Sequence, residues 1–317
     1  MIKKLCFTII NLFIQFIKKL KLDIYAFDKI IFCLGDVNIS NNKIKYNEVS
    51  KLSEVEVKVF SQNGEDGILD YLFNKLKVDS KNFVEIGVGD YRESNTRFLY
   101  QKYHPKGLII DYIDDMEKKV KPFLNFWKGD LTICKKKIDS KNILDVLNKN
   151  CNFEIDVFSL DIDSIDYWII DELKPNISKI FIAEYNHVFG SELEVTVPNI
   201  SGFERNNYHY SNLCYGMSLK ALIKLMEKKD YYFIGSNVQK NNAFFISNDF
   251  KKEEFFNNIE IKSLDNYTNS NIRESLNKDS SLSYLSGDKK LKEIEECKVI
   301  NLKDNKKDLV KIKELLN

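Results

Sequence analysis

Short apolar runs alternate with helix-like patterns from about residue 55 to residue 250. Continuous apolar runs with helices between them are typical of a parallel sheet covered on both faces. The last two runs are joined by only a short Asn-rich segment, so these strands are expected to pair antiparallel. The pattern predicts an α/β fold with a doubly wound, mostly parallel sheet that ends in an antiparallel hairpin. The predicted strands are 83–86, 107–110, 125–127, 156–160, 179–183, 231–234 and 243–246, and the predicted helices are 64–77, 98–103, 116–120, 142–147, 168–173 and 219–227.

The N-terminal segment carries a different pattern. Residues 5–17 are mostly apolar, and Lys3, Lys4, Lys18 and Lys19 flank them. This stretch is shorter than the roughly 20 residues that cross a bilayer, and no small-x-small cleavage site follows it. Its polar residues recur at steps of three and four, which predicts an amphipathic helix. Such a helix could lie on an anionic membrane surface or dock on protein, and the sequence leaves both alternatives open.

Composition divides the chain into three parts. Residues 1–50 form the helical extension, closed by a linker at 35–50 that is rich in Asn, Ser and Lys. Residues 51–250 form the α/β domain. Residues 251–317 form a Lys- and Asn-rich extension with a helical pattern at 308–316. Acidic residues interleave with the lysines there, which is typical of a solvated face rather than of a nucleic-acid site.

The overall composition excludes several classes of protein. With 44% hydrophobic and 13% aromatic residues among 317, the chain can bury a sizeable core, which excludes global disorder. Lys plus Arg number 48 and Asp plus Glu 47, and this balance argues against a nucleic-acid partner. The six cysteines include no CxxC pair, so neither a zinc site nor a disulfide framework is indicated, and a reducing cytoplasm is expected.

Two glycines directly follow the first predicted strand, in the segment Glu85-Ile86-Gly87-Val88-Gly89. Doubly wound sheets bind nucleotide-like ligands at this edge. A dinucleotide-binding turn would need a third glycine where this chain has Arg92. The acidic Glu85 suits a cationic amino-acid ligand better than a pyrophosphate, which favours S-adenosylmethionine as the cofactor.

Two further carboxylates are candidates for the nucleoside part of that cofactor. Asp111 ends the second predicted strand, where it could accept hydrogen bonds from ribose hydroxyls. Asp130 follows the third predicted strand and could accept a hydrogen bond from the adenine amine.

At this point the chain resembles the FkbM-type S-adenosylmethionine-dependent methyltransferases, over about residues 58–300. The resemblance implies a seven-stranded class I methyltransferase fold and O-methylation of a sugar or another hydroxylated metabolite. It implies that Glu85, Gly87, Gly89, Asp111 and Asp130 are cofactor contacts, with Gln62 and Glu65 folding over the methionine end. The acidic string 111–114 (DYID) departs from the small residues common in the family there. The segments that carry the resemblance are 61–67 (SQNGEDG), 84–90 (VEIGVGD), 95–96 (NT), 159–163 (SLDID), 166–168 (DYW), 184–186 (EYN), 209–212 (HYSN) and 215–218 (YGMS).

The candidate catalytic residues lie after the fourth and fifth predicted strands. Asp161 and Asp163 alternate along the chain and would face the same way if that chain were extended, so either could orient or deprotonate a substrate hydroxyl. The alternatives are loop carboxylates in solvent, or a divalent metal held with Glu184 and Asn186. His187 and His209 are further candidate bases. Arg92 and Arg205 could bind an acidic substrate or the cofactor carboxylate.

These observations predict a cytoplasmic methyltransferase that uses S-adenosylmethionine on a small-molecule or glycan acceptor, with peripheral membrane contact through residues 1–34 left open. The alternative is a catalytically inactive scaffold or binding protein that keeps the methyltransferase fold, in a glycan-biosynthesis or membrane-surface assembly. A nicotinamide oxidoreductase ranks third.

Overall fold

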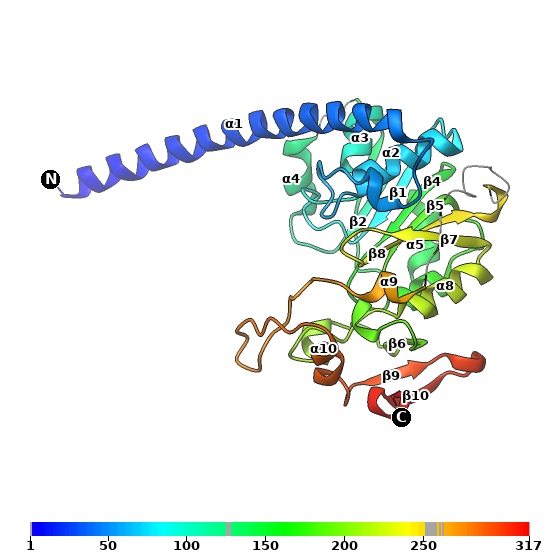
Figure 1. The fold of residues 1–317 in the computed structure, drawn as a ribbon. Helices are drawn as coiled ribbons and strands as arrows, with labels where there is room; N and C mark the ends of the chain where they lie inside the picture. The colour runs from blue at the N-terminus through cyan, green and yellow to red at the C-terminus, as the bar shows by residue number, and fades with distance from the viewer. Residues whose placement is uncertain (1, 125–127, 251–258, 260, 262, 317) are drawn as a thin grey trace.

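The centre of the molecule is a seven-stranded sheet in the order β3-β2-β1-β4-β5-β8-β7 (Figure 1). The computed structural model describes residues 2–124, 128–250, 259, 261 and 263–316. The sheet is parallel from β3 to β5, and β8 pairs antiparallel with both of its neighbours. This order with one reversed strand is that of the class I methyltransferase fold, so the predicted fold class is confirmed. The strands are β1 (Phe83–Ile86), β2 (Gly107–Asp111), β3 (Leu131–Lys135), β4 (Ile155–Leu160), β5 (Ser178–Glu184), β7 (Tyr231–Ser236) and β8 (Asn242–Ser247).

Helices cover both faces of this sheet, which explains why its central strands are mostly apolar. Successive residues of a strand point to opposite faces. Val84 and Ile86 belong to the core that includes residues of α5, α6 and α8, whereas Phe83 and Val157 belong to the core that includes residues of α2, α3 and α4. The covering helices are α2 (Glu65–Leu76), α3 (Arg97–Tyr103), α4 (Met116–Val120), α5 (Ile143–Asn150), α6 (Asp166–Glu172) and α8 (Leu219–Lys228).

The third strand lies later in the chain than the sequence predicts. β3 pairs with β2 from Leu131 opposite Gly107 to Lys135 opposite Asp111. It is an edge strand whose residues are only partly buried, so no continuous apolar run marks it. The predicted strand at 125–127 lies outside the described residues.

The N-terminal extension is one long helix, α1 (Ile2–Asn42). The predicted linker at 35–50 is therefore wrong for its first part, because the helix continues to Asn42. Ile39 is fully buried and packs with Val59 and Phe98, and this packing stabilises the last part of α1 as a helix. The 3-10 helices Lys43–Lys45 and Leu52–Val55 then lead to α2. Among the described residues, no helix combines the length and apolarity that crossing a membrane requires.

The C-terminal extension packs on the domain through a second, three-stranded antiparallel sheet in the order β10-β9-β6. The predicted helix at 308–316 is wrong, because residues 308–311 pair with β9 and bring Val310 opposite the buried Val299. A 3-10 helix, Ile312–Leu315, follows. The remaining elements are β6 (Val195–Thr196), β9 (Lys298–Asn301), β10 (Asp308–Lys311), α7 (Arg205–Tyr208), α9 (Asp265–Thr268), α10 (Asp288–Glu293) and the 3-10 helices Lys121–Phe123, His187–Phe189, Asn248–Phe250 and Lys303–Asn305.

Candidate active site

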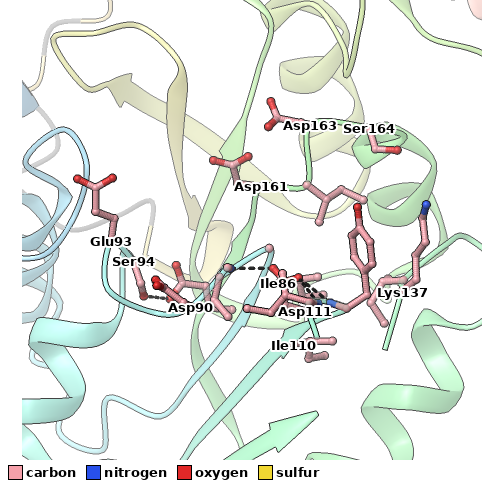
Figure 2. Close-up of a pocket in the computed structure, with 18 of the residues that line it drawn as sticks. Ile86, Asp90, Glu93, Ser94, Ile110, Asp111, Lys137, Asp161, Asp163 and Ser164 are labelled. Atoms are coloured by element: carbon pink, nitrogen blue, oxygen red, sulfur yellow. Dashed lines mark hydrogen bonds between the residues drawn. The ribbon is translucent and has the colours of Figure 1, made fainter. Parts of the chain in front are cut away.

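A cavity of about 950 Å³ opens at the carboxyl ends of β1, β2 and β4. This is the edge at which doubly wound sheets bind ligands, and the volume suits a nucleotide-sized molecule. Figure 2 shows Asp161 and Asp163 on one side of this cavity, with Asp111 beside Ile86 and Ile110. Its described lining holds more acidic than basic side chains, which favours a cationic ligand. The acidic residues are Glu85, Asp90, Glu93, Asp111, Asp161, Asp163 and Glu204, and the basic ones are Arg92, Lys136, Lys137 and Arg205.

The glycine turn after β1 lines the cavity. Gly87 has a φ of +91°, and a Cβ at this position would lie 1.6 Å from the carbonyl oxygen of Asp161. The backbone after β1 therefore packs directly on the backbone after β4, which only glycine permits. Gly89 also has a positive φ, but no atom lies within 4 Å of the position its Cβ would take. Its backbone is thus open to a ligand.

Asp111 ties the end of β2 to this turn. Its Oδ2 accepts a hydrogen bond of 2.7 Å from the Gly89 amide, and its Oδ1 accepts from the amides of Tyr112 (2.6 Å) and Ile113 (3.1 Å). A carboxylate has about four lone-pair sites. One site on Oδ2 is therefore left for a ligand hydroxyl, as a role in ribose binding requires.

Glu85 lines the cavity, and four hydrogen bonds hold its carboxylate in place. Oε1 accepts from the Asn95 amide at 2.8 Å, and Oε2 accepts from Ser94 Oγ at 2.6 Å and from the amide and hydroxyl of Thr96. These bonds hold the segment that leads into α3. Glu85 thus shapes the cavity wall, and because its Oε1 accepts only one bond and keeps a lone pair, the cofactor contact stays a prediction.

Of the two residues expected over the methionine end, only Gln62 lines the cavity. Glu65 is fully buried and accepts hydrogen bonds from the side-chain amides of Asn237 (2.7 Å) and Asn242 (2.8 Å) and from the amide of Asn63 (2.8 Å). It joins the start of α2 to the β7–β8 hairpin.

Asp130 does not line the cavity, so the predicted adenine contact is wrong. The residue is exposed and precedes β3, whereas the cavity lies at the carboxyl ends of the parallel strands. The residues that follow β3 are Lys136, Lys137 and Ile138, and these line the cavity instead. The late position of β3 is the cause of the error.

Three carboxylates from two strand ends meet at one side of the cavity. Asp161 and Asp163 follow β4, Glu184 ends β5, and one oxygen of each lies within 4.8 Å of the others. The two aspartates meet in a turn rather than along an extended chain, because Asp163 has a φ of +54° and the Asp166 carboxylate accepts from the Ser164 amide at 2.9 Å. Asp161 and Asp163 are close together, as predicted, but a turn brings them together and not the alternation of an extended chain.

The surroundings of this cluster favour protonated carboxyls. Burial and the neighbouring carboxylates raise the pKa of Asp161 and that of Glu184 well above their usual range. The Arg205 guanidinium donates to Asp163 at 2.7 Å and opposes the effect of burial on the pKa of that group. The Tyr215 hydroxyl lies 3.4 Å from Glu184 and donates to it. The cluster therefore holds its protons more tightly than ordinary carboxyls do.

The other predicted catalytic and metal-binding residues serve the local structure. His187 is buried, and burial and Lys290, 3.1 Å from its Nε2, lower its pKa to about 3. His209 pairs through Nδ1 with Ser211 Oγ at 2.7 Å. Neither histidine lines the cavity. Asn186 is fully buried and uses both ends of its amide on the loop backbone, so it is not a candidate ligand.

The sequence interpretation missed Asn242 and Asn212, which also line the cavity. β8 runs against its neighbours, so its first residue, Asn242, reaches the edge where the parallel strands end. The Oδ1 atoms of both asparagines are buried and have no hydrogen-bond partner. For Asn242 the only signal in the sequence was an asparagine at the start of an apolar run, whereas Asn212 lies in the segment 209–212 that carries the resemblance.

No protein-family model matches the chain, and no curated protein matches it either. Parts of several solved structures are similar. PhzM, a pyocyanin biosynthetic protein, has 9% identity and a TM-score of 0.33 over 56% of this chain and 53% of its own. An S-adenosylmethionine-dependent methyltransferase from Clostridium acetobutylicum has 10% identity and a TM-score of 0.36 over 56% and 89% of the two chains. PKMT2 from Rickettsia typhi, solved with AdoHcy, has 11% identity and a TM-score of 0.35 over 56% and 52%.

The matched region spans only about half of the PhzM and PKMT2 chains. Similarities at these identities and TM-scores carry no argument about activity, and the sheet order is what assigns the fold. The FkbM-type resemblance stays a prediction.

Proposed function

We propose that the protein is an S-adenosylmethionine-dependent methyltransferase. The observation that carries this proposal is the bond from the Gly89 amide to the Asp111 carboxylate, in a turn whose Gly87 packs on the β4 backbone. A glycine turn with positive φ and a carboxylate with one free lone pair lie together at this edge of the sheet, whose strand order is that of the class I methyltransferase fold. This combination fits a nucleoside with ribose hydroxyls and a positive charge, and it lacks the third glycine that a pyrophosphate needs.

Gly89, Asp111 and Gln62 would hold the cofactor, with Ile113 and Ile138 as apolar lining. When bound, S-adenosylmethionine supplies a methyl group on a sulfonium, which is a good leaving group. The residues of the chain need therefore only bind, orient and deprotonate the acceptor.

The acceptor would be a hydroxyl compound, such as a sugar or another hydroxylated metabolite. Asp161 lines the cavity and burial raises its pKa, so its deprotonated form is a stronger base than an ordinary carboxylate and can accept the hydroxyl proton as the new carbon–oxygen bond forms. Arg205 donates a 2.7 Å hydrogen bond to Asp163 and so fixes the position of this carboxylate. The unpartnered Oδ1 atoms of Asn212 and Asn242 add two acceptors for further hydroxyls of a polyhydroxylated molecule.

The same three carboxylates are also spaced to hold a divalent cation. Asp163 already pairs with a guanidinium, and Asn186 is taken up by its loop, which leaves Asp161 and Glu184 as the free ligands. Titration of the protein with Mg²⁺ in a calorimeter separates the two roles. Heat that disappears in Glu184→Gln would favour a cation over proton transfer.

Calorimetric titration with S-adenosylhomocysteine tests the proposed function. We expect saturable binding to one site per chain, and methyl transfer from labelled S-adenosylmethionine to a member of a panel of glycans and lipid-linked sugars. The absence of binding at millimolar ligand would overturn the proposal. Binding without transfer to any member of the panel would favour the scaffold alternative.

A further inference from the structure

The N-terminal half of α1 stands away from the rest of the molecule (Figure 1). Every residue from 8 to 16 is exposed, although most of them are large and apolar. Leu12 is 60% exposed, Phe13 62% and Phe16 58%. Side chains of this size are rarely left in water on a folded chain unless they bind something.

The other half of the same helix is firmly attached. The ring centroids of Phe32 and Phe98 lie 5.3 Å apart, and Ile39 is fully buried. Asp28 pairs with Arg97 at 2.6 Å, and this arginine is itself buried. Because one continuous helix joins the two halves, the body holds the exposed half out into solvent.

The helical period of the sequence predicts that the apolar residues between 5 and 17 cover most of the helix circumference. At 3.6 residues per turn, the apolar positions between 5 and 17 cover an arc of about 220°, and a narrow polar stripe fills the rest. The stripe consists of Lys4, Thr8, Asn11, Gln15 and Lys18. An arc this wide suits immersion in an apolar phase better than contact along a single seam.

The charge of this segment indicates what it binds. Residues 1–21 hold five lysines and no acidic residue. We propose that residues 5–17 of α1 bind the surface of an anionic phospholipid bilayer, with the apolar arc at the boundary of headgroups and acyl chains and the flanking lysines supplying the attraction to phosphate. The stretch is about 20 Å long, less than the roughly 30 Å of a hydrocarbon core, so it lies in the surface and does not cross.

A second copy of the chain fits these observations less well. A two-stranded coiled coil uses a narrow apolar stripe and opposite charges beside it. Two copies of this segment would bring lysines together with no carboxylate to pair with them, in either orientation. A lipid surface supplies the negative charge that the segment lacks.

Vesicle flotation of the full-length protein tests this inference. We expect the protein to float with vesicles of phosphatidylcholine and phosphatidylglycerol, to float much less with phosphatidylcholine alone, and to be released by high salt. The variant Phe13→Glu/Phe16→Glu should lower the floated fraction roughly tenfold or more, because two buried phenyl rings are lost. Lys18→Gln/Lys19→Gln should weaken flotation at low salt.

Ile44→Glu is the matched control, because Ile44 is 86% exposed but lies just beyond α1, and it should float like the wild type. Wild-type protein that stays in the dense fraction with anionic vesicles would overturn the inference. So would a Phe13→Glu/Phe16→Glu variant that floats normally. Light scattering that shows a dimer lost in that variant, without flotation of either protein, would assign the segment to a second copy instead.

Discussion

The Asp111 carboxylate at the end of β2 accepts a 2.7 Å hydrogen bond from the backbone N–H of Gly89 in the turn after β1. Two neighbouring strands are thereby joined where the proposed cofactor would bind. The same carboxylate also accepts from two amides of its own loop, so one side chain sets the geometry of both turns. This double use explains why a charged acceptor is needed at this position.

Replacing this carboxylate should weaken cofactor binding. In Asp111→Asn the side-chain NH2 would face either the Gly89 amide and the ribose or the amides of Tyr112 and Ile113, and a charged hydrogen bond is lost. A bond to a charged group is worth about 1.5–3 kcal/mol, so we expect the affinity for S-adenosylhomocysteine to fall roughly 10- to 100-fold. Calorimetry measures the change. Asp114→Asn, three residues further on at a 95% exposed position, should leave the affinity unaltered.

The two glycines of the turn should differ in what they tolerate. Gly87→Ala places a methyl group 1.6 Å from a backbone oxygen, so β1 and β4 would have to separate at their ends. We expect a loss of more than about 4 kcal/mol in the free energy of unfolding, together with loss of binding. Gly89→Ala meets open space and should cost only about 1–2 kcal/mol for its left-handed backbone. Urea denaturation of both variants gives the comparison, and equal costs would contradict it.

Glu85 should matter for stability before it matters for binding. Glu85→Ala leaves the buried donors of Ser94, Asn95 and Thr96 without their acceptor. Removing one partner of a buried charged network costs about 3–5 kcal/mol. We expect that loss in urea denaturation, and a much smaller change for Glu93→Ala, an exposed carboxylate on the same loop. A Glu85→Ala protein of normal stability that fails to bind would instead support the direct cofactor contact.

The acidic cluster predicts a pH dependence of stability. Burial raises the pKa of Glu184 well above that of the unfolded chain, so the folded protein binds the proton more tightly. The resulting stabilisation is full at acidic pH and is lost as the pH rises through the folded-state pKa. Glu184→Gln removes this loss, so at pH 8 the variant should be more stable than the wild type by about 1 kcal/mol or more. At pH 5 the difference should shrink.

Denaturation curves at the two pH values measure this effect. Glu192→Gln, whose carboxylate is 88% exposed, serves as the control and should follow the wild type at both. A Glu184→Gln variant whose stability follows the wild type from pH 5 to pH 8 would show that Glu184 is not protonated in the folded protein.

The sequence was enough to predict the sheet because its central strands are buried on both faces. β1, β2, β4 and β5 are short, mostly apolar runs, and all were located to within one residue at either end. β3 and β10 lie at sheet edges and are only partly buried, so their residues do not form such runs. Because β10 has no continuous apolar run, the sequence pattern wrongly predicted a helix at 308–316.

The site was predictable mainly where a residue follows a parallel strand. Asp111, Asp161 and Asp163 fall at such positions, and all three line the cavity. Asn242 reaches it from the start of a reversed strand, which no local pattern reveals. His187 contacts Lys290 of the C-terminal extension, which only the tertiary fold determines, whereas His209 pairs with Ser211 in its own loop.

The position of β8 between β5 and β7 has a consequence for synthesis on the ribosome. The free edge of β5 is paired by a strand that is translated some sixty residues later, and Ile180 meets Ile246 only then. Until that point the nascent chain presents an apolar, unpaired strand edge, which is a hazard for aggregation. Any product that terminates before β8 would keep that edge exposed, and we expect such truncated chains to be insoluble.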